Sequence, residues 1–277
     1  MISFSGVWVN VSNVAPTVSA FYRALFGGLF LLAAACWKKE ITWKGWYRLL
    51  LGSLCGLFLA LDLFFWHRSI GYIGPGLATI LGNFQVFFLA GLGVVFMGEK
   101  VSAKFFFAIL MAIIGLFLVV GLQWHQLETH YKTGVYLGLA TAVAYTAFLL
   151  TLRKLQSGQA ATVTFYGMMV VSFATAFFLG TQGIYSGDAF TIPDTRSLAA
   201  LLLLGLTSQG IGWVLISNAL PRIRASLAGL ILLLQPSLAF IWDVLLFQRA
   251  TSTLNWIGVI IAITAIYLGM TKNSDDI

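Results

Sequence analysis

Apolar residues form long runs along most of this chain, and polar residues are confined to short breaks between them. Nine of these runs are about 20 residues long, enough to cross a bilayer as helices. They alternate too weakly and run too long for the strands of a membrane barrel. We expect membrane helices near residues 17–37, 47–66, 74–97, 103–121, 134–153, 162–180, 198–220, 226–246 and 254–271.

Two of these runs repeat one another. Segment 74–102 and segment 224–252 align at an offset of 150 residues, which places Gln85 opposite Gln235. A second match joins SAFYRALF at 19–26 to VTFYGMMV at 163–170. We therefore expect two five-helix repeats, over residues 1–122 and 133–272.

The second match also explains the apolar stretch 2–14, which is too short to cross a bilayer at 1.5 Å per residue. It aligns with the end of the run at 134–153. We expect a tenth, shortened helix there, so that the chain is an all-α integral membrane protein with about ten transmembrane helices.

The basic residues predict how the two repeats are oriented. An odd number of helices per repeat gives the two copies opposite orientations. With the N-terminus inside, eleven basic residues fall in inner connections and four, Arg68, Lys132, Arg196 and Arg249, fall in outer ones. Because positive charge holds loops inside, we expect both termini in the cytoplasm and an inverted-topology repeat, as in many secondary transporters.

Composition supports a lipid environment. The chain is 60% hydrophobic and 9% charged, whereas soluble domains are about 45–50% apolar and about 25% charged. The net charge of +7 does not indicate nucleic-acid binding, because the basic residues sit in small groups between apolar runs. Cys36 and Cys55 lie in apolar runs and offer neither a disulfide framework nor zinc spacing.

This arrangement resembles the drug/metabolite transporter superfamily, EamA type. The resemblance covers nearly the whole chain and rests on the order and spacing of five motifs: Phe21-Tyr22-Arg23, Gly76-Leu77-Ala78, Gly98-Glu99-Lys100, Gly134-Val135-Tyr136-Leu137 and Ala225–Pro236. Two features depart from the family pattern, namely Gln248-Arg249 in place of Gly-Glu and the shortened first helix. The second departure affects the central cavity, because the family's first helix lines it.

The resemblance implies a secondary carrier of small polar or amphipathic metabolites, such as amino acids, that works by alternating access in the cytoplasmic membrane. Export is commoner than uptake in the family. We expect no catalysis, cofactor, metal or nucleic-acid partner, and a monomer or a homodimer in the lipid bilayer. The chain contains no Walker motif for ATP hydrolysis.

Polar side chains near the middle of the predicted helices are the first candidates for a substrate site. Asn83 and Gln85 lie about ten residues into one helix, and Gln235 lies about ten residues into its counterpart, just before Pro236. An inverted repeat brings equivalent midpoints together, where transporters bind substrates. Hydrogen bonding between helices, without any ligand, explains the same residues.

Arg23 is the costliest residue to place in lipid, at about 2.5–3.5 kcal/mol. Asp62 lies at a comparable depth on the next helix, so we expect an ion pair that fixes helix packing. The functional alternative is that Arg23 receives a substrate carboxylate. Trp8, Tyr145 and Trp213 lie inside spans that line the cavity in the resembling family, and Gln209 shares a helix face with Trp213 four residues later.

Two other classes of function compete with a metabolite carrier. One is a lipid or headgroup flippase of the same superfamily, which needs a laterally open basic groove to which Arg23 alone could contribute. The other is an intramembrane enzyme with Asp62 and Asp243 as a pair of catalytic carboxylates. Neither aspartate has the flanking glycine of membrane aspartyl proteases.

Overall fold

The computed structural model describes residues 1–41, 43–120, 131–157, 164–248 and 251–270. Every element within these ranges is helical. In chain order they are η1 (Ile2–Phe4), α1 (Ser5–Ser12), α2 (Pro16–Trp37), α3 (Trp46–Gly82), α4 (Gln85–Met97), α5 (Ala103–Val120), α6 (Tyr131–Gln156), α7 (Thr164–Ser186), α8 (Thr195–Leu204), the π-helical η3 (Gly205–Gly212), α9 (Trp213–Ala219), η4 (Leu220–Arg222), α10 (Ala225–Leu232), α11 (Leu234–Phe247) and α12 (Thr253–Met270).

These elements confirm the predicted fold class. Among the described residues, seven helical stretches are long and apolar enough to cross a membrane, and α5 and α12 supply two shorter apolar helices. The eight-residue α1 is the tenth and is too short to span, as predicted for the first helix.

Three boundaries differ from the sequence expectation. The gap predicted near residues 67–73 is helical, and α3 continues through it to Gly82. The predicted span 198–220 consists of α8, η3 and α9, and the predicted span 226–246 consists of α10 and α11. Hydrophobic length indicated the spans correctly, but it does not show where hydrogen bonding changes within them.

The chain forms two compact units. Unit 1 contains residues 1–67 and 147–222, and unit 2 contains residues 68–146 and 223–277. Each unit therefore combines segments from both predicted repeats, and the repeat boundaries at 122 and 133 stay a prediction.

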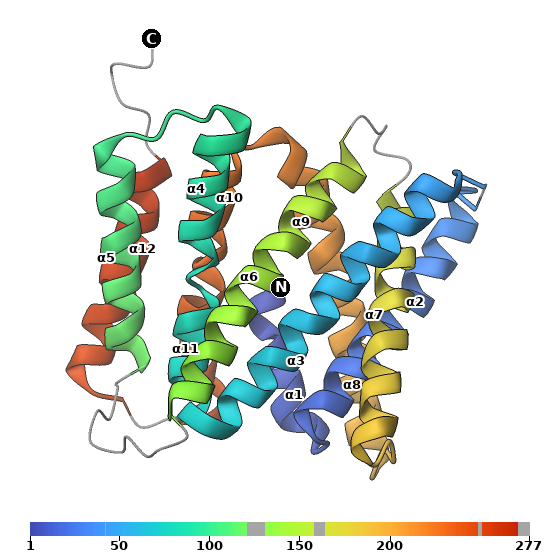
Figure 1. Cartoon of the computed structure of the whole chain (residues 1–277). Coiled ribbons are helices and arrows are strands. Elements are labelled where there is room, and N and C mark those ends of the chain that lie inside the picture. The colour runs from blue at the N-terminus through green and yellow to red at the C-terminus, as the bar shows by residue number, and fades with distance from the viewer. Residues whose placement is uncertain (42, 121–130, 158–163, 249–250, 271–277) are drawn as a thin grey trace. The chain divides into compact units, whose positions relative to one another are not determined.

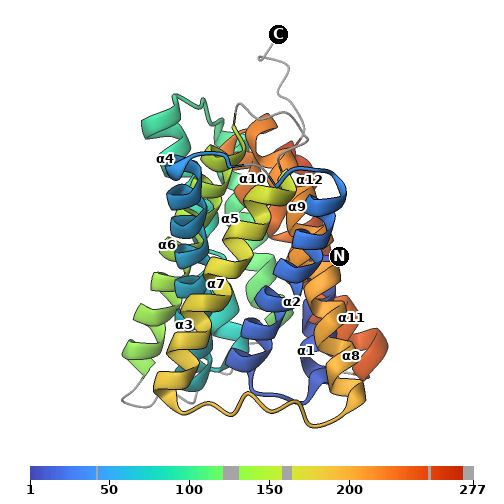
Figure 2. The same cartoon turned by 90° about the vertical axis from the view of Figure 1, so that its right-hand side faces the viewer.

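In unit 1, α2 packs antiparallel on α7, its predicted repeat counterpart (Figure 2). Small residues allow the contact. A Cβ atom added at Gly28 would meet the ring of Phe173 at 3.0 Å, and one at Gly180 would meet the ring of Phe21 at 3.0 Å. The reversed order of these two contacts along the helices is what an antiparallel pair requires.

In unit 2, α5 packs antiparallel on α12 (Figure 1). A Cβ at Gly115 would lie 2.7 Å from the backbone nitrogen of Ala262, so the two backbones touch. At one end of the pair, the side chain of Asn255 donates to the carbonyls of Leu118 and Val119 at 3.0 Å each. Close approach of small residues is the usual way in which membrane helices associate.

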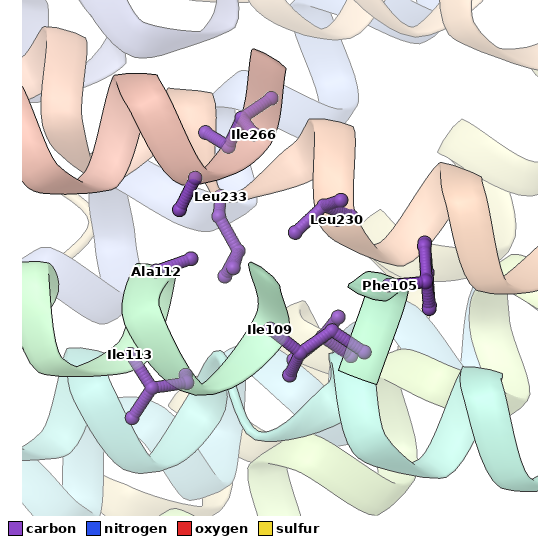
Figure 3. Close-up of a cluster of buried hydrophobic side chains, with 9 residues drawn as sticks. Phe105, Ile109, Ala112, Ile113, Leu230, Leu233 and Ile266 are labelled. Carbon is purple, nitrogen blue, oxygen red and sulfur yellow. The ribbon is translucent and has the colours of Figure 1, made fainter. Parts of the chain in front are cut away.

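A cluster of buried apolar side chains joins α5 and α12 to α10 in the same unit (Figure 3). Ile109 and Ala112 on α5 lie opposite Leu230 and Leu233, and each is at most 1% exposed. This packing fixes α10 directly before the point where its helix is interrupted.

Candidate functional site

Two repeat-related helices of unit 2 are interrupted at equivalent positions. The first ends with α3 at Gly82 and resumes with α4 at Gln85. The second ends with α10 at Leu232 and resumes with α11 at Leu234. The interruptions lie 150 residues apart, which is the offset of the repeat.

The backbone bonds differently at both interruptions. The Phe84 N–H donates to the Leu81 carbonyl at 3.0 Å, and the Leu233 N–H donates to the Leu230 carbonyl at 3.1 Å. Both bonds span three residues, as in a 3₁₀ turn, instead of the four of an α-helix. Irregular backbone within a membrane is tolerated where protein encloses it or where it lines a cavity.

The two interruptions have different chemical causes. In the second helix, Pro236 lacks the N–H that would bond to the Leu232 carbonyl, and its ring disfavours a regular helix there. In the first helix no proline follows the interruption, and the Asn83 side chain donates from Nδ2 to the carbonyl of Thr79 at 2.8 Å, beside the backbone bond of the Asn83 N–H to the same oxygen. The repeats therefore keep the same local geometry with different residues.

Gln85 and Gln235 each occupy the first turn after an interruption. Gln85 is 0% exposed, and its Nε2 donates to the Gly229 carbonyl at 3.3 Å. Its Oε1 is buried without a hydrogen-bond partner among the described residues. Gln235 is only half-buried, and its buried Nε2 likewise has no hydrogen-bond partner there.

A glycine makes the contact of Gln85 possible. A Cβ at Gly229 would lie 3.2 Å from the Cα of Val86 and 3.1 Å from the side chain of Leu89, so α4 and α10 are close at this level. Unit 2 thus contains the polar centre predicted for these two helices. The cavity that both glutamines were predicted to face stays a prediction.

Asn83 and Tyr145 are the other candidates in unit 2. Asn83 bonds within its own helix, as described above, and is half-buried. Tyr145 is half-buried on α6. Their predicted roles in substrate binding are untested by these contacts.

In unit 1, Gln209 lies in the π-helical segment η3 and is 1% exposed. Its Nε2 donates to the Ser172 hydroxyl on α7 at 3.0 Å. A Cβ at Gly27 of α2 would lie 2.4 Å from the Cβ of Gln209. Gln209 therefore joins three helical segments, which is the packing role weighed for polar residues in membranes.

The π-helical segment η3 changes which residue lies one turn before Trp213. The Trp213 N–H bonds to the Ser208 carbonyl five residues earlier, so Ser208 lies one turn below Trp213. The pairing of Gln209 with Trp213 at a four-residue spacing assumed an α-helix, and their shared role in a substrate site stays a prediction. Ser208, which was not selected from the sequence, is 0% exposed and its hydroxyl lies 2.8 Å from that of Ser5.

The two tryptophan candidates in unit 1 differ in burial. Trp213 is 2% exposed and packs edge-on against Phe148, with ring centroids 4.8 Å apart. Trp8 is half-buried and packs on Phe4. Its buried Nε1 has no hydrogen-bond partner among the described residues.

Arg23 and Asp62 are half-buried on α2 and α3 of unit 1. The charge of Arg23 acts on both Asp62 and His67. The three groups thus form one ionisable cluster within the spanning helices. The Arg23–Asp62 ion pair stays a prediction.

Three acidic residues that sequence reasoning did not select follow helices directly. Each comes just after a residue with positive φ: Glu40 after Lys39, Asp188 after Gly187 and Glu99 after Gly98. Each bonds to the first turn of the helix that pairs with its own. An acid immediately after the left-handed residue at a helix end is the sequence signal for this contact.

The contacts of these acids are specific. Glu40 accepts from the Tyr166 N–H on α7 at 3.1 Å, and Asp188 accepts from the Thr17 hydroxyl on α2 at 3.0 Å. Glu99 accepts from the N–H groups of Ala225 and Ser226 on α10 at 2.6 and 3.1 Å, and from the Ser226 hydroxyl at 2.7 Å. Negative charge is favourable at a helix N-terminus, where backbone N–H groups are unpaired.

The described residues contain no group of three or more His, Cys, Asp or Glu side chains that could hold a metal ion. The polar atoms at the interrupted helices are neutral amides. They suit hydrogen bonding to a polar solute better than proton transfer or metal ligation.

The geometry up to this point defines a multi-pass helical membrane protein whose repeat-related helices are interrupted as in secondary transporters. Comparison with known proteins gives the family. The model of the EamA-like transporter family matches residues 2–121 and 132–271, so the chain belongs to this family. The resemblance to the drug/metabolite transporter superfamily and the two-repeat architecture are thereby confirmed.

One similar solved structure is a crystal structure with a TM-score of 0.83, which covers 96% of this chain and 93% of that chain at 17% sequence identity. At this identity the likeness shows the fold alone. A comparison with curated proteins finds no match.

Proposed function

We propose that this protein is a secondary transporter of small polar or amphipathic metabolites, such as amino acids, across the cytoplasmic membrane. The observation that supports this best is the pair of repeat-related interruptions in unit 2, each followed by a glutamine with an unpartnered buried amide atom. In transporters with inverted repeats, interrupted helices of this kind hold the substrate.

Neutral amides at the site favour substrates that offer hydrogen-bond donors and acceptors. A fully charged group buried against amides alone pays a large desolvation cost. An amino acid or a related zwitterion can place its carboxylate and amino groups among several donors and acceptors. The sequence predicts Trp8, Tyr145 and Trp213 as further substrate contacts that are apolar with one polar atom, and Arg23 as a contact of a substrate carboxylate.

Alternating access is the mechanism that an inverted repeat supports, because rocking one bundle against the other exposes a fixed site to each side in turn. Export is proposed on the family resemblance. The bias of basic residues supports cytoplasmic termini. Reporter fusions should place residues 123–132 outside and residues 154–160 inside; a result on the same side would contradict this orientation.

The transport proposal is tested with purified protein in liposomes that contain an equimolar mixture of ¹⁴C-labelled amino acids. The native protein should release label faster than empty liposomes, and Gln235→Leu should lose most of the excess rate. Ser237→Ala is the matched control, because Ser237 is fully buried on the same helix and bonds only within it. Scrambling of fluorescent phospholipid without release of amino acids would indicate the flippase instead.

A further inference from the structure

The two repeat-related glutamines make different hydrogen bonds. Gln85 uses its Nε2 to donate across the helix pair, to the Gly229 carbonyl at 3.3 Å. In a regular α-helix, the Gly229 carbonyl would accept from the Leu233 N–H. At the interruption this N–H donates to the Leu230 carbonyl instead, so the Gly229 carbonyl can accept from Gln85. Gln85 therefore replaces a backbone bond that the interruption of its partner helix removes.

The corresponding carbonyl in the first repeat is satisfied differently. The counterpart of Gly229 is Thr79, whose carbonyl accepts from the Asn83 side chain at 2.8 Å and from the Asn83 N–H at 3.0 Å. The counterpart of Asn83 in the second repeat is Leu233, which has no side-chain donor. One repeat thus satisfies its carbonyl locally, and the other satisfies it through a glutamine.

This difference leaves Gln235 without the role that Gln85 has. Its Nε2 is buried and has no hydrogen-bond partner among the described residues, although an unpaired buried donor is costly. The two side chains also differ in access, because Gln85 is 0% exposed and Gln235 is only half-buried. Of the two glutamines, Gln235 is therefore the more exposed.

Resting on the transport function above, we propose that Gln235 is the specificity-determining residue, and that it donates a hydrogen bond from Nε2 to a carboxylate or carbonyl oxygen of the substrate. Gln85 is a positioning residue that holds α10 against α4. The two repeats have thus diverged at this position: Gln235 binds the ligand, and Gln85 has a structural role.

An amide donor discriminates strongly between solutes. A site built to donate to an oxygen rejects an analogue without that oxygen, because its N–H is then buried unpaired, and such rejection reaches about 10⁴-fold in favourable cases. The substrate class that follows is a solute with an oxygen acceptor beside its apolar part.

The first test needs no substrate. After replacement of Cys36 and Cys55 by Ser and Ala, single cysteines at Gln85 and Gln235 are treated with a water-soluble cationic methanethiosulfonate. We expect the Gln235→Cys protein to react at least about tenfold faster, as its greater exposure predicts. Equal rates, faster reaction at position 85, or no reaction at position 235 would overturn the proposal.

The second test keeps the native cysteines and measures transport of the ¹⁴C-labelled amino acid mixture in liposomes. Gln235→Leu should raise KM about tenfold or more with little loss of folded protein, whereas Gln85→Leu should lower the yield of folded protein and leave KM of the remainder unchanged. An unchanged KM in Gln235→Leu would contradict the assignment. If the native protein moves no labelled amino acid, the transport proposal fails, and the thiol reaction rates still decide the role of Gln235.

Discussion

The helix pair α2–α7 in unit 1 and the pair α4–α10 in unit 2 share an antiparallel packing but differ in the acidic contacts at their ends. In the first pair, α2 packs on its repeat counterpart α7, and in the second, α4 packs on α10, which precedes the counterpart of α4, α11. Acids close both ends of the first pair, since Glu40 bonds to α7 and Asp188 bonds to α2. In the second pair, Glu99 bonds to α10 at one end.

At the other end of the second pair, the sequence contains neither the acid nor the backbone N–H that such a contact needs. The residue that corresponds to Glu99 is Arg249, which lies outside the described residues. The residue that corresponds to Ala225 is Pro75, which lies within α3 and has no N–H to donate. Gln248 still adopts the left-handed conformation of Gly98, with φ of 52° against 64°.

This difference indicates which helix pair can change its contacts more easily. The pair with acids at both ends has no interrupted helix, whereas α4 and α10 each border an interruption, with Gln85 on α4 and Gln235 on α11, directly after α10. We expect the contacts of the α4–α10 pair to change during transport and those of the α2–α7 pair to be retained.

The largest effect is expected from filling the tightest glycine contact of α2. In Gly27→Ala the new Cβ would meet the Cβ of Gln209 at 2.4 Å, and neither backbone can easily shift. Overpacking of this kind costs about 3 kcal/mol. The matched change Gly229→Ala meets its neighbours at 3.1 Å or more and should cost about 1 kcal/mol. Chemical unfolding in detergent measures both; equal losses would contradict the difference in packing.

Removing the acid contacts should give the next largest effect. Glu99→Ala loses acceptors for two backbone N–H groups and a hydroxyl, and we expect it to destabilise the protein by about 2 kcal/mol. Asp188→Ala loses one bond to a hydroxyl and should cost about 1 kcal/mol.

Glu99→Gln is the control for this comparison, because it keeps a side-chain oxygen and should recover part of the loss. Thermal unfolding of the four proteins under one condition measures the order. If Asp188→Ala were the more damaging change, the acid at the end of α4 would not be the stronger contact.

A smaller effect is expected at the left-handed residues of α4 and α11. A Cβ at Gly98 would meet nothing within 4 Å, so Gly98→Ala pays only for backbone strain, about 1 kcal/mol. Gln248→Gly relieves the same strain and should stabilise the protein by a little less, because glycine also gains entropy in the unfolded chain. Opposite signs of the two shifts in unfolding temperature are the expected result; equal signs would contradict it.

The smallest effect concerns an acid that caps its own helix. Asp194 accepts from the Ser197 N–H at 2.7 Å at the start of α8. This hydrogen bond lowers the pKa of the carboxyl below its usual value, although the group is fully exposed. The stabilisation is therefore complete above the unfolded pKa, near 3.9, and is lost as pH falls through the lower folded pKa.

Unfolding temperatures of the native protein and Asp194→Asn, compared between pH 3 and pH 6, test this effect. The difference between the two proteins should shrink toward the acidic end. A difference that grows as pH falls would contradict the direction of the pKa shift.

Hydrophobic length and internal similarity predicted much of this fold. They indicated the number of helices, the shortened first helix and the equivalent places of Gln85 and Gln235. Pro236 is a sequence signal for the second interruption, but the first has none, because Phe84 looks like an ordinary residue of an apolar helix. The π-helical turn before Trp213 was likewise invisible, since five-residue and four-residue bonding leave the same apolar pattern.

The contacts of the candidate site were harder to predict. The sequence gives no sign that Asn83 bonds within its helix while Gln85 bonds across to Gly229, because both are amides in similar surroundings. Glu40 and Asp188 were not selected from the sequence, and Glu99 entered only as part of the motif Gly98-Glu99-Lys100. Their contacts with the neighbouring helices depend on the left-handed residues before them. At Lys39 this conformation could not be predicted, because the residue is not a glycine.

The most direct test of the divergence between the two repeats is a double-mutant cycle between Asn83 and Gln235, read as KM for the labelled amino acid mixture. Asn83→Ala removes the side-chain bond to the Thr79 carbonyl and keeps the backbone bond, so the second lone pair of that oxygen can then accept from Gln235 as Gly229 accepts from Gln85. We expect Asn83→Ala to raise KM several-fold in the native background and to have no effect once Gln235 is leucine. Equal effects of Asn83→Ala in both backgrounds would contradict a free, substrate-binding amide at Gln235.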